Sequence, residues 1–372
     1  MVQERPAMRA LGVLGLALVA AMAVSACGSN GASASDDHDV TLATATRAAR
    51  AQYDANVAFA QGYVGQCRAT GTRPRVLVSG FGRFLSIADN ATGRILSELT
   101  GVPYPETTAP AAGQLDPPAR QVSVALTTLS LPNVGDVDVC AMILPVDWDL
   151  ASILIAREAE AFHPTFVMMN GVAGDRQPLW IELGATNRAA RLVDGTNLLV
   201  PTGENDLVPL VDDAPSSEDA RPNLLAWSTV RAAAREAVSR HAREVDGGER
   251  FQDLLEGAEL AGFPRSSNTY LCNNTTYVTG FLMDHPGRPV SLLRASPPVA
   301  GAANDVTVTM GVDLSQVPRV FVHWPSELAD KHHAAAADVM RSILAAQLGA
   351  TESSTRGDNR QADPSLAGGA FF

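Results

Sequence analysis

Short apolar runs alternate with longer amphipathic stretches over most of the chain. Continuous apolar runs, typical of strands buried on both faces of a parallel sheet, occur at 75–79, 165–169 and 319–323. Further strands are expected at 122–131, at 137–145 and up to Glu182. Helical spacing and capping residues predict helices at 48–63, 90–99, 149–162, 227–244, 272–283 and 326–348. This alternation predicts a single three-layer α/β/α domain with a mixed, mainly parallel sheet.

The composition of the remaining segments divides the chain into four parts. We expect a signal segment at 1–27, a tether and N-terminal helix at 28–70, the α/β domain at 71–349 and a disordered tail at 350–372. Within the domain, insertions are expected at 103–118, 201–221 and 287–317, where proline, glycine and polar residues gather.

The first segment has the features of an export signal. Arg5 and Arg9 flank an apolar run at 11–24, which is too short for a transmembrane helix. The run ends in Val24-Ser25-Ala26-Cys27, which resembles a bacterial lipobox. That resemblance implies an exported lipoprotein of the cell envelope, held at the membrane by a lipid on Cys27. The alternative is an ordinary signal peptide with a chance cysteine.

Composition and charge exclude some partners. The chain has 372 residues, 46% of them hydrophobic, which is enough for a sizeable core. The net charge is −12, and no basic patch stands out, so we expect no nucleic-acid partner and no broad electrostatic attachment to anionic lipid.

The sequence contains four cysteines. With Cys27 assigned to a lipid and Cys272 to chemistry, Cys67 and Cys140 remain. In an oxidising compartment these two would pair as a disulfide. The alternative is that both are small buried apolar residues.

Three residues carry the candidate chemistry. Cys272 lies where an apolar segment meets an expected helix start, and a helix N-terminus favours a thiolate. His323 ends an apolar strand, and Glu182 lies inside another apolar run. Cysteine, histidine and an acid that orients the histidine are the parts of a cysteine hydrolase. Taken singly, they would also fit a buried thiol, a core histidine and an acid paired with a structural arginine.

Six sequence blocks in the same order strengthen the catalytic interpretation. They are 76–84 (VLVSGFGRF), 144–146 (LPV), 171–176 (GVAGDR), 181–182 (IE) with Asn187 downstream, 269–273 (TYLCN) and 321–325 (FVHWP). Over residues 75–348 the chain resembles the pyroglutamyl peptidase I family of cysteine peptidases, also called pyrrolidone-carboxylate peptidases.

The resemblance implies a mechanism and a substrate. It implies a triad of Cys272, His323 and Glu182, with Arg191 beside the oxyanion if one residue is deleted here. It places the pyroglutamyl ring against Phe81, Phe84 and Tyr270. The implied activity is that of an omega-peptidase, which hydrolyses the amide after an N-terminal pyroglutamyl residue. The implied partner is an N-terminally blocked peptide, and neither a metal nor an organic cofactor is expected.

Two other functions stay open. The first loop lacks the glycines and prolines usual in the family, and the insertions are long. These departures would suit a non-catalytic binding lipoprotein that has kept the fold. They would also suit a hydrolase of another N-blocked peptide or lactam. Whether the chain forms a homo-oligomer is left open as well.

Overall fold

The structure is a computed structural model. It describes residues 47–364, apart from 86, 112–113, 175–176, 191, 197, 199–206, 265–268, 295–305 and 329–330. The expected signal segment with Cys27 lies outside the described residues, so the export and lipidation predictions are untested.

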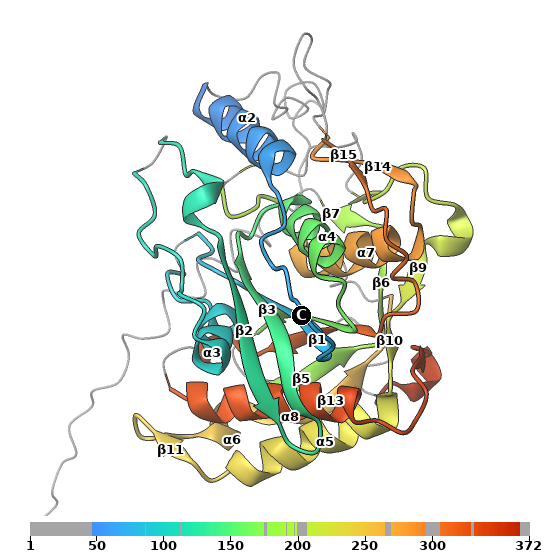
Figure 1. Cartoon of the computed structure of the whole chain (residues 1–372). Helices are drawn as coiled ribbons and strands as arrows, with labels where there is room; N and C mark the ends of the chain where they lie inside the picture. Colours follow the sequence, from blue (N-terminus) through green and yellow to red (C-terminus); the bar gives the residue numbers. More distant parts are fainter. Residues whose placement is uncertain are drawn as a thin grey trace, which may run out of the picture. The chain divides into compact units, whose positions relative to one another are not determined.

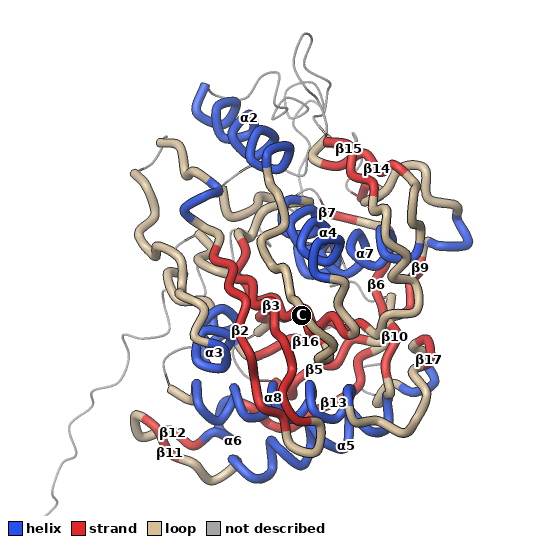
Figure 2. Tube along the Cα trace, in the orientation of Figure 1, coloured by secondary structure: helices blue, strands red, loops and turns tan. Residues whose placement is uncertain are grey.

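A nine-stranded sheet forms the middle layer (Figures 1 and 2). Its main path, in spatial order, is β13 (Leu255–Ala261), β5 (Gln177–Glu182), β16 (Arg319–Trp324), β4 (Phe166–Val172), β1 (Arg75–Phe81), β3 (Gly135–Leu144) and β2 (Ser123–Leu131). Strands β16, β4, β1 and β3 are parallel, and β5 and β13 are parallel to each other. Strand β5 runs antiparallel to β16, and β2 runs antiparallel to β3. The predicted mixed, mainly parallel sheet is confirmed.

Helices cover both faces of this sheet (Figures 1 and 2). The core on one face includes α2 (Arg47–Gly62), α4 (Leu150–Phe162) and α7 (Leu271–Asp284). The core on the other face includes α3 (Ala91–Thr100), α5 (Trp227–His241), α6 (Phe251–Leu254) and α8 (His333–Leu348). The three expected layers are therefore present.

Strand periodicity determines which side chains face α7. In β16, Val320 and Val322 belong to the core under α5 and α8, whereas Phe321 belongs to the core under α4 and α7. Because successive side chains alternate across a strand, His323 lies on the same face as Phe321. The same alternation in β5 turns Glu182 away from Ile181 and towards that face.

Short elements join the layers. Small antiparallel pairs form between β6 (Gly184–Thr186) and β9 (Ala220–Pro222), β7 (Ala189–Ala190) and β8 (Leu207–Val208), β11 (Val245–Asp246) and β12 (Glu249–Arg250), and β14 (Pro289–Leu292) and β15 (Val306–Thr309). The 3₁₀ turns are η2 (Pro118–Arg120), η3 (Ser216–Glu218), η4 (Ser326–Leu328) and η5 (Asn359–Gln361).

The chain after α8 corrects the expected tail. Strand β17 (Thr355–Arg356) pairs with β10 (Leu224–Leu225), which in turn pairs with β16. The Asp363 carboxylate accepts a hydrogen bond from the backbone of Leu260 at 2.9 Å and forms an ion pair with Arg231. The prediction of a disordered tail at 350–372 is wrong for its described part, because residues up to 364 pair with the domain.

A second difference between the prediction and the structure concerns the closing helix near the C-terminal end. The sequence predicts one helix over 326–348, but the structure has the short turn η4 and then α8 from His333. Helix α8 packs beside α5 on the far face from α7.

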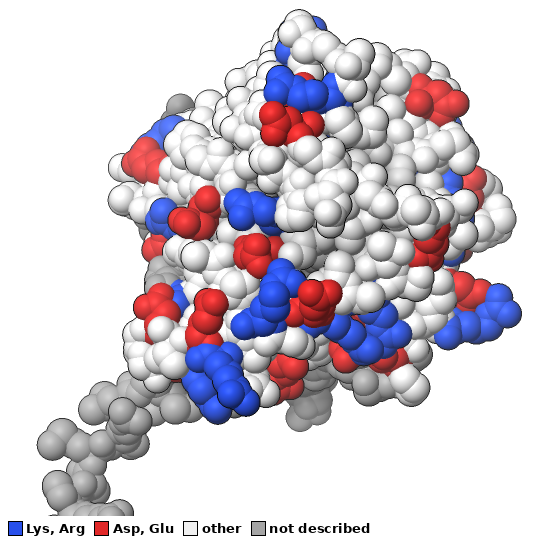
Figure 3. All heavy atoms as spheres, turned by 60° about the horizontal axis from the view of Figure 1, so that its bottom comes forward, with Lys and Arg blue, Asp and Glu red and all other residues white. Residues whose placement is uncertain are grey.

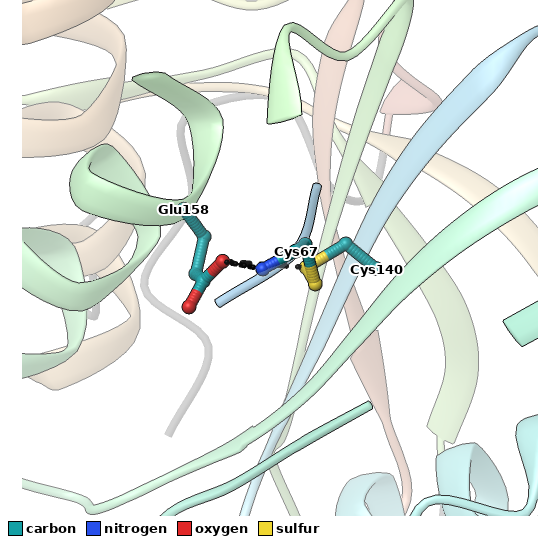
Figure 4. A group of neighbouring side chains, drawn as sticks. All are labelled: Cys67, Cys140 and Glu158. Atoms are coloured by element: carbon teal, nitrogen blue, oxygen red, sulfur yellow. Dashed lines mark hydrogen bonds between the residues drawn. A yellow bond between two sulfur atoms is a disulfide. The ribbon is translucent and has the colours of Figure 1, made fainter. Parts of the chain in front are cut away.

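Cys67 and Cys140 form a disulfide, so the pairing is confirmed and the two residues are not free buried thiols (Figure 4). Cys140 lies within β3, and the bond ties the segment before β1 to it. Glu158 of α4 is fully buried beside the disulfide and accepts hydrogen bonds from the backbone N–H of Cys67 at 2.8 Å and from the Tyr63 hydroxyl at 2.6 Å. Among the described residues, Cys272 is the free cysteine.

Charged side chains of both signs alternate on the face over α5 (Figure 3). Examples are the ion pairs of Arg235 with Glu259 and of Arg240 with Asp338. Within the described part of the chain, no helix combines the length and the apolar content needed to span a bilayer.

Candidate active site

Three adjacent strands bring the histidine and the acid together. In the register of the sheet, His323 of β16 lies opposite Gly171 of β4 on one side and opposite Trp180 of β5 on the other. Glu182 pairs with Phe321, two residues from His323. Side chains at such diagonal positions on one face are within reach of each other. The sheet therefore places an imidazole next to a carboxylate.

The predicted nucleophile, Cys272, lies in the first turn of α7. Tyr270 is the N-cap residue and Leu271 the first helical residue, so Cys272 occupies the second helical position. The first N–H groups of a helix have no partner within the helix, and their dipoles favour a negative charge. The position of Cys272 thus suits a thiolate, as the sequence predicted.

The three predicted triad residues meet in one contact chain. His323 Nδ1 lies 2.8 Å from Glu182 Oε1, and the imidazole shares a hydrogen bond with Cys272. Since Nδ1 is engaged by Glu182, Nε2 is the nitrogen left for the thiol. Burial opposes a charge on the ring, but Cys272 and Glu182 together raise the pKa of His323 to about 9. The imidazole is therefore held in its protonated form at neutral pH, as a partner for a thiolate.

Gly171 provides the space that the Cys272 thiol occupies. A Cβ atom at this position would lie 2.7 Å from Cys272 Sγ and 2.7 Å from the Phe321 ring. Such distances are shorter than van der Waals contact, so any other residue here would displace the sulfur or the ring. The absence of a side chain on β4 allows the thiol to lie directly against the sheet beside His323.

Two asparagines after the nucleophile fix the start of α7. The side chain of Asn273 donates to the backbone oxygens of Thr186 at 2.8 Å and Arg188 at 2.9 Å and accepts from the N–H of Thr186 at 2.8 Å. Asn274 donates to Asp149 Oδ1 at 2.6 Å. Both asparagines are buried, so the helix start is attached to the segment after Glu182 and to the start of α4.

Aromatic side chains gather around Tyr270, two residues before Cys272. Tyr270 makes edge contacts with Phe84, at 6.3 Å between ring centroids, and with Trp148, at 5.4 Å. Phe84 and Tyr270 are half-buried, whereas Phe81 is 4% exposed and belongs to the core. The structure thus brings two of the three predicted pocket aromatics together and places the third beneath the surface.

Some site residues were missed by the sequence analysis, and one cannot be placed. Arg191, the predicted oxyanion residue, lies outside the described residues. The sequence did not assign a role to Gly171 or Trp148, although each lies in or next to a block that carries the family resemblance. A glycine just after the predicted buried strand 165–169, and inside one of the blocks, was the available signal for the first. For Trp148 there was no signal, because its contact with Tyr270 joins distant segments.

Comparisons with known proteins give matches at the level of structure. No family model matches the sequence, and no curated protein matches it. Among solved structures, pyroglutamyl peptidase I of Bacillus amyloliquefaciens is 12% identical, with 75% of this chain and 99% of that chain covered and a TM-score of 0.44. Pyrrolidone carboxyl peptidase of Thermococcus litoralis is 16% identical, with 74% and 93% covered and a TM-score of 0.42. The enzyme of Pyrococcus furiosus is 16% identical, with 74% and 98% covered and a TM-score of 0.44. At these values the likeness concerns the fold alone.

Proposed function

We propose that this protein is a cysteine peptidase that uses Cys272, His323 and Glu182 as a catalytic triad. The observation that supports this proposal is the continuous contact from the thiol through the imidazole to the buried carboxylate. A thiol at a helix N-terminus beside a protonated imidazole has the arrangement of an activated sulfur nucleophile. A merely structural cysteine would need neither the histidine nor the acid.

The proposed reaction proceeds in two steps. The Cys272 thiolate attacks the carbonyl carbon of an amide, and the backbone N–H groups at the start of α7 stabilise the oxyanion together with Arg191. The His323 imidazolium then protonates the leaving amine, and a thioester remains on Cys272. In the second step, His323 takes a proton from water, which attacks the thioester; the acyl C–S bond breaks, the carboxylic acid leaves, and the Cys272 thiolate and His323 imidazolium are restored. Glu182 keeps Nδ1 engaged, so Nε2 faces the reacting atoms throughout.

The proposed substrate is a peptide blocked by an N-terminal pyroglutamyl residue. The half-buried rings of Phe84 and Tyr270 offer an apolar surface for the uncharged lactam ring beside the nucleophile. The sequence blocks around these residues support the same assignment. Such an omega-peptidase would release the lactam acid and a peptide with a free amino terminus.

The test of this function is amine release by the full-length protein. Pyroglutamyl 7-amido-4-methylcoumarin should be hydrolysed, and Cys272→Ala should abolish the release. Alanyl and prolyl amides of the same dye serve as controls for substrate class. Turnover that persists in Cys272→Ala would contradict the mechanism. A parent protein that binds lactam amides but never turns them over would instead be a binding protein.

We also propose that the protein is exported and lipid-anchored through Cys27. The sequence Val24-Ser25-Ala26-Cys27 after an apolar run supports this, and the Cys67–Cys140 disulfide suits an oxidising compartment. Expressed in a bacterium, the protein should partition with membranes, and Cys27→Ser should remove the acyl mass from its mature N-terminus. A mass spectrum with an unmodified mature N-terminus elsewhere would contradict the anchor.

A further inference from the structure

Two aromatic side chains of the site hold the backbone of one short stretch through their polar ends. Tyr270 lies two residues before Cys272, and its hydroxyl donates to the backbone oxygen of Val193 at 2.5 Å. The indole Nε1–H of Trp148 donates to the backbone oxygen of Leu192 at 2.9 Å. The two rings are themselves in contact, at 5.4 Å between centroids. Two adjacent carbonyl groups are therefore held by two adjacent side chains.

The chain before these two carbonyl groups is held by the start of α7 and the residues just ahead of it. The N–H of Ala190 donates to the backbone oxygen of Thr269 at 2.7 Å. The side-chain amide of Asn273 donates to the backbone oxygen of Arg188 at 2.9 Å. Hydrogen bonds thus hold the backbone on both sides of position 191.

Position 191 is the one to which the proposed mechanism gives the oxyanion arginine. Arg191 lies outside the described residues, but its neighbours on both sides are described. An oxyanion group needs a fixed place relative to Cys272, since a misplacement near 1 Å can reduce turnover by about 10²-fold. Val193 is 37% exposed, so this stretch reaches the surface, where a backbone without such hydrogen bonds moves more freely.

We propose that Tyr270 and Trp148 are positioning residues for the oxyanion group. Their hydrogen bonds hold the backbone that follows Arg191 against the start of α7 and so fix the arginine relative to Cys272. The inference rests on the proposed function, because that function gives Arg191 its role. It divides the work of Tyr270: the ring stays available to the lactam, whereas the hydroxyl acts on the transition state through the backbone. kcat should therefore depend on the hydroxyl, and KM on the ring.

The main alternative is that the Tyr270 hydroxyl binds the substrate directly. Burial raises the pKa of Tyr270, and the charges of Asp194, Cys272 and Asp147 add to that effect, so the hydroxyl stays protonated. Its one proton is engaged by Val193, which leaves only the acceptor side of the oxygen for a substrate N–H. A contact of that kind would appear in KM rather than in kcat.

The experiment uses Tyr270→Phe and Trp148→Phe in the full-length protein. Each variant loses one donor and keeps an aromatic ring in its place. We expect kcat for the pyroglutamyl amide to fall about tenfold in each, the size of one lost hydrogen bond, with KM within about twofold of the parent. Alkylation of Cys272 by iodoacetamide at pH 6–7 should stay parental, because the thiol, the imidazole and the acid are unchanged.

Two hydrogen bonds of the same kind provide matched controls. The Tyr277 hydroxyl donates to the backbone oxygen of Glu218 at 2.9 Å, and Trp227 Nε1–H donates to that of Thr355 at 2.8 Å. Tyr277→Phe and Trp227→Phe therefore remove equivalent bonds, and neither acceptor belongs to residues 188–193. Both controls should keep the parental kcat, whatever they change in stability.

A double variant tests the route of the effect. If the Tyr270 hydroxyl acts by way of Arg191, it has nothing left to position once the arginine is removed. Tyr270→Phe should then change kcat by less than about twofold in an Arg191→Ala background.

Hydrogen exchange gives a readout that needs no turnover. Mass spectrometry of peptides that cover residues 188–198 should show faster exchange in Tyr270→Phe and Trp148→Phe, because their backbone is no longer held. The two control variants should exchange as the parent does over the same residues.

Several outcomes would overturn the inference. A KM that rises in Tyr270→Phe at unchanged kcat would assign the hydroxyl to the substrate. Parental kcat in both variants, or an equal fall in the controls, would show that these bonds serve the structure alone. A further tenfold loss on top of Arg191→Ala would show that the hydroxyl does not act through the arginine.

Failure of the inference can be told apart from failure of the proposed function. If the parent hydrolyses the pyroglutamyl amide in any of the cases above, the proposed function stands without the inference. A parent without turnover contradicts the proposed function instead, and hydrogen exchange then decides whether the two side chains hold this backbone. Parental exchange in both variants would show that they do not.

Discussion

Two buried acids flank the start of α7, and their surroundings are opposite. Glu182 is 2% exposed and holds the imidazole of His323 at 2.8 Å. Asp147 is 1% exposed and has no described hydrogen-bond partner. Glu182 belongs to the proposed catalytic half of the site and is engaged within the chain, whereas Asp147 has no hydrogen-bond partner among the described residues. The difference indicates that the proposed triad is preorganised, whereas the burial of Asp147 costs free energy of folding.

A third acid, Asp284, supports the structure only, and its charge is balanced by cations. Asp284, at the other end of α7, forms ion pairs with Arg319, Arg221 and Arg356. Although burial opposes its charge, these arginines lower the pKa of Asp284 below its usual value. Unlike Asp284, Asp147 has no side-chain hydrogen-bond partner among the described residues.

The largest expected effect comes from removing the imidazole. His323→Ala deletes the group that protonates the leaving amine, a step worth roughly 10²–10⁴-fold in rate. Release from the pyroglutamyl amide should fall by that factor, while far-UV circular dichroism stays that of the parent. Trp180→Phe, which keeps an aromatic ring against His323, is a control that should lose far less. Near-parental turnover in His323→Ala would contradict a catalytic role for the imidazole.

A smaller but still large effect is expected at Gly171. An added methyl group in Gly171→Ala would push Cys272 Sγ from its place, and a misplacement near 1 Å can reduce turnover by about 10²-fold. Gly62→Ala, where a Cβ meets nothing within 4 Å, is the matched control. Steady-state kcat of both variants tests whether the bare backbone of β4 is required. Parental kcat in Gly171→Ala would show that the thiol does not react from this position.

The acid should matter less than the base, and it should change the pH dependence. Because the pKa of His323 is raised to about 9, the imidazolium is present below that pH, and turnover should fall as pH passes through it. Glu182→Gln removes one of the charges that raise this pKa, so the alkaline fall should move to lower pH. We also expect the variant to keep more turnover than His323→Ala, since the glutamine oxygen still accepts from Nδ1–H. A pH–kcat profile measures both effects, and an alkaline limb that does not move would separate Glu182 from the imidazole.

The burial of Asp147 should affect the free energy of unfolding rather than kcat. A carboxyl whose pKa is raised by folding loses stability as pH rises above the unfolded value near 3.8 towards the folded value. Asp147→Asn lacks this penalty. Its advantage in unfolding free energy over the parent should therefore be absent in acid and grow by at most about 1.4 kcal/mol per pH unit. Urea unfolding at several pH values measures it, and a difference independent of pH would mean that Asp147 is not a buried neutral acid.

Local patterns predicted the layers, and the three residues that meet at the candidate site, better than the contacts between distant segments. The run 75–79 and the helix beginning near Cys272 were predictable because burial on both faces and helical spacing are visible within a few residues. The two-residue strands β10 and β17 were not, because their pairing depends on partners more than a hundred residues apart. Cys272, His323 and Glu182 each lie in a recognisable block. The lack of a described hydrogen-bond partner for Asp147 could not be predicted, since it depends on which groups surround the carboxyl in three dimensions.

The reactivity of Cys272 towards iodoacetamide, in the parent and in His323→Ala, tests the central claim most directly. If the thiolate is stabilised by the imidazolium of His323, the parent should be alkylated readily at pH 6–7. The variant should react at least about tenfold more slowly there, and the two rates should converge at alkaline pH. The disulfide keeps Cys67 and Cys140 out of the reaction in the absence of reductant. Equal rates for parent and variant across the pH range would show that Cys272 and His323 do not act as one site, and the triad would be contradicted.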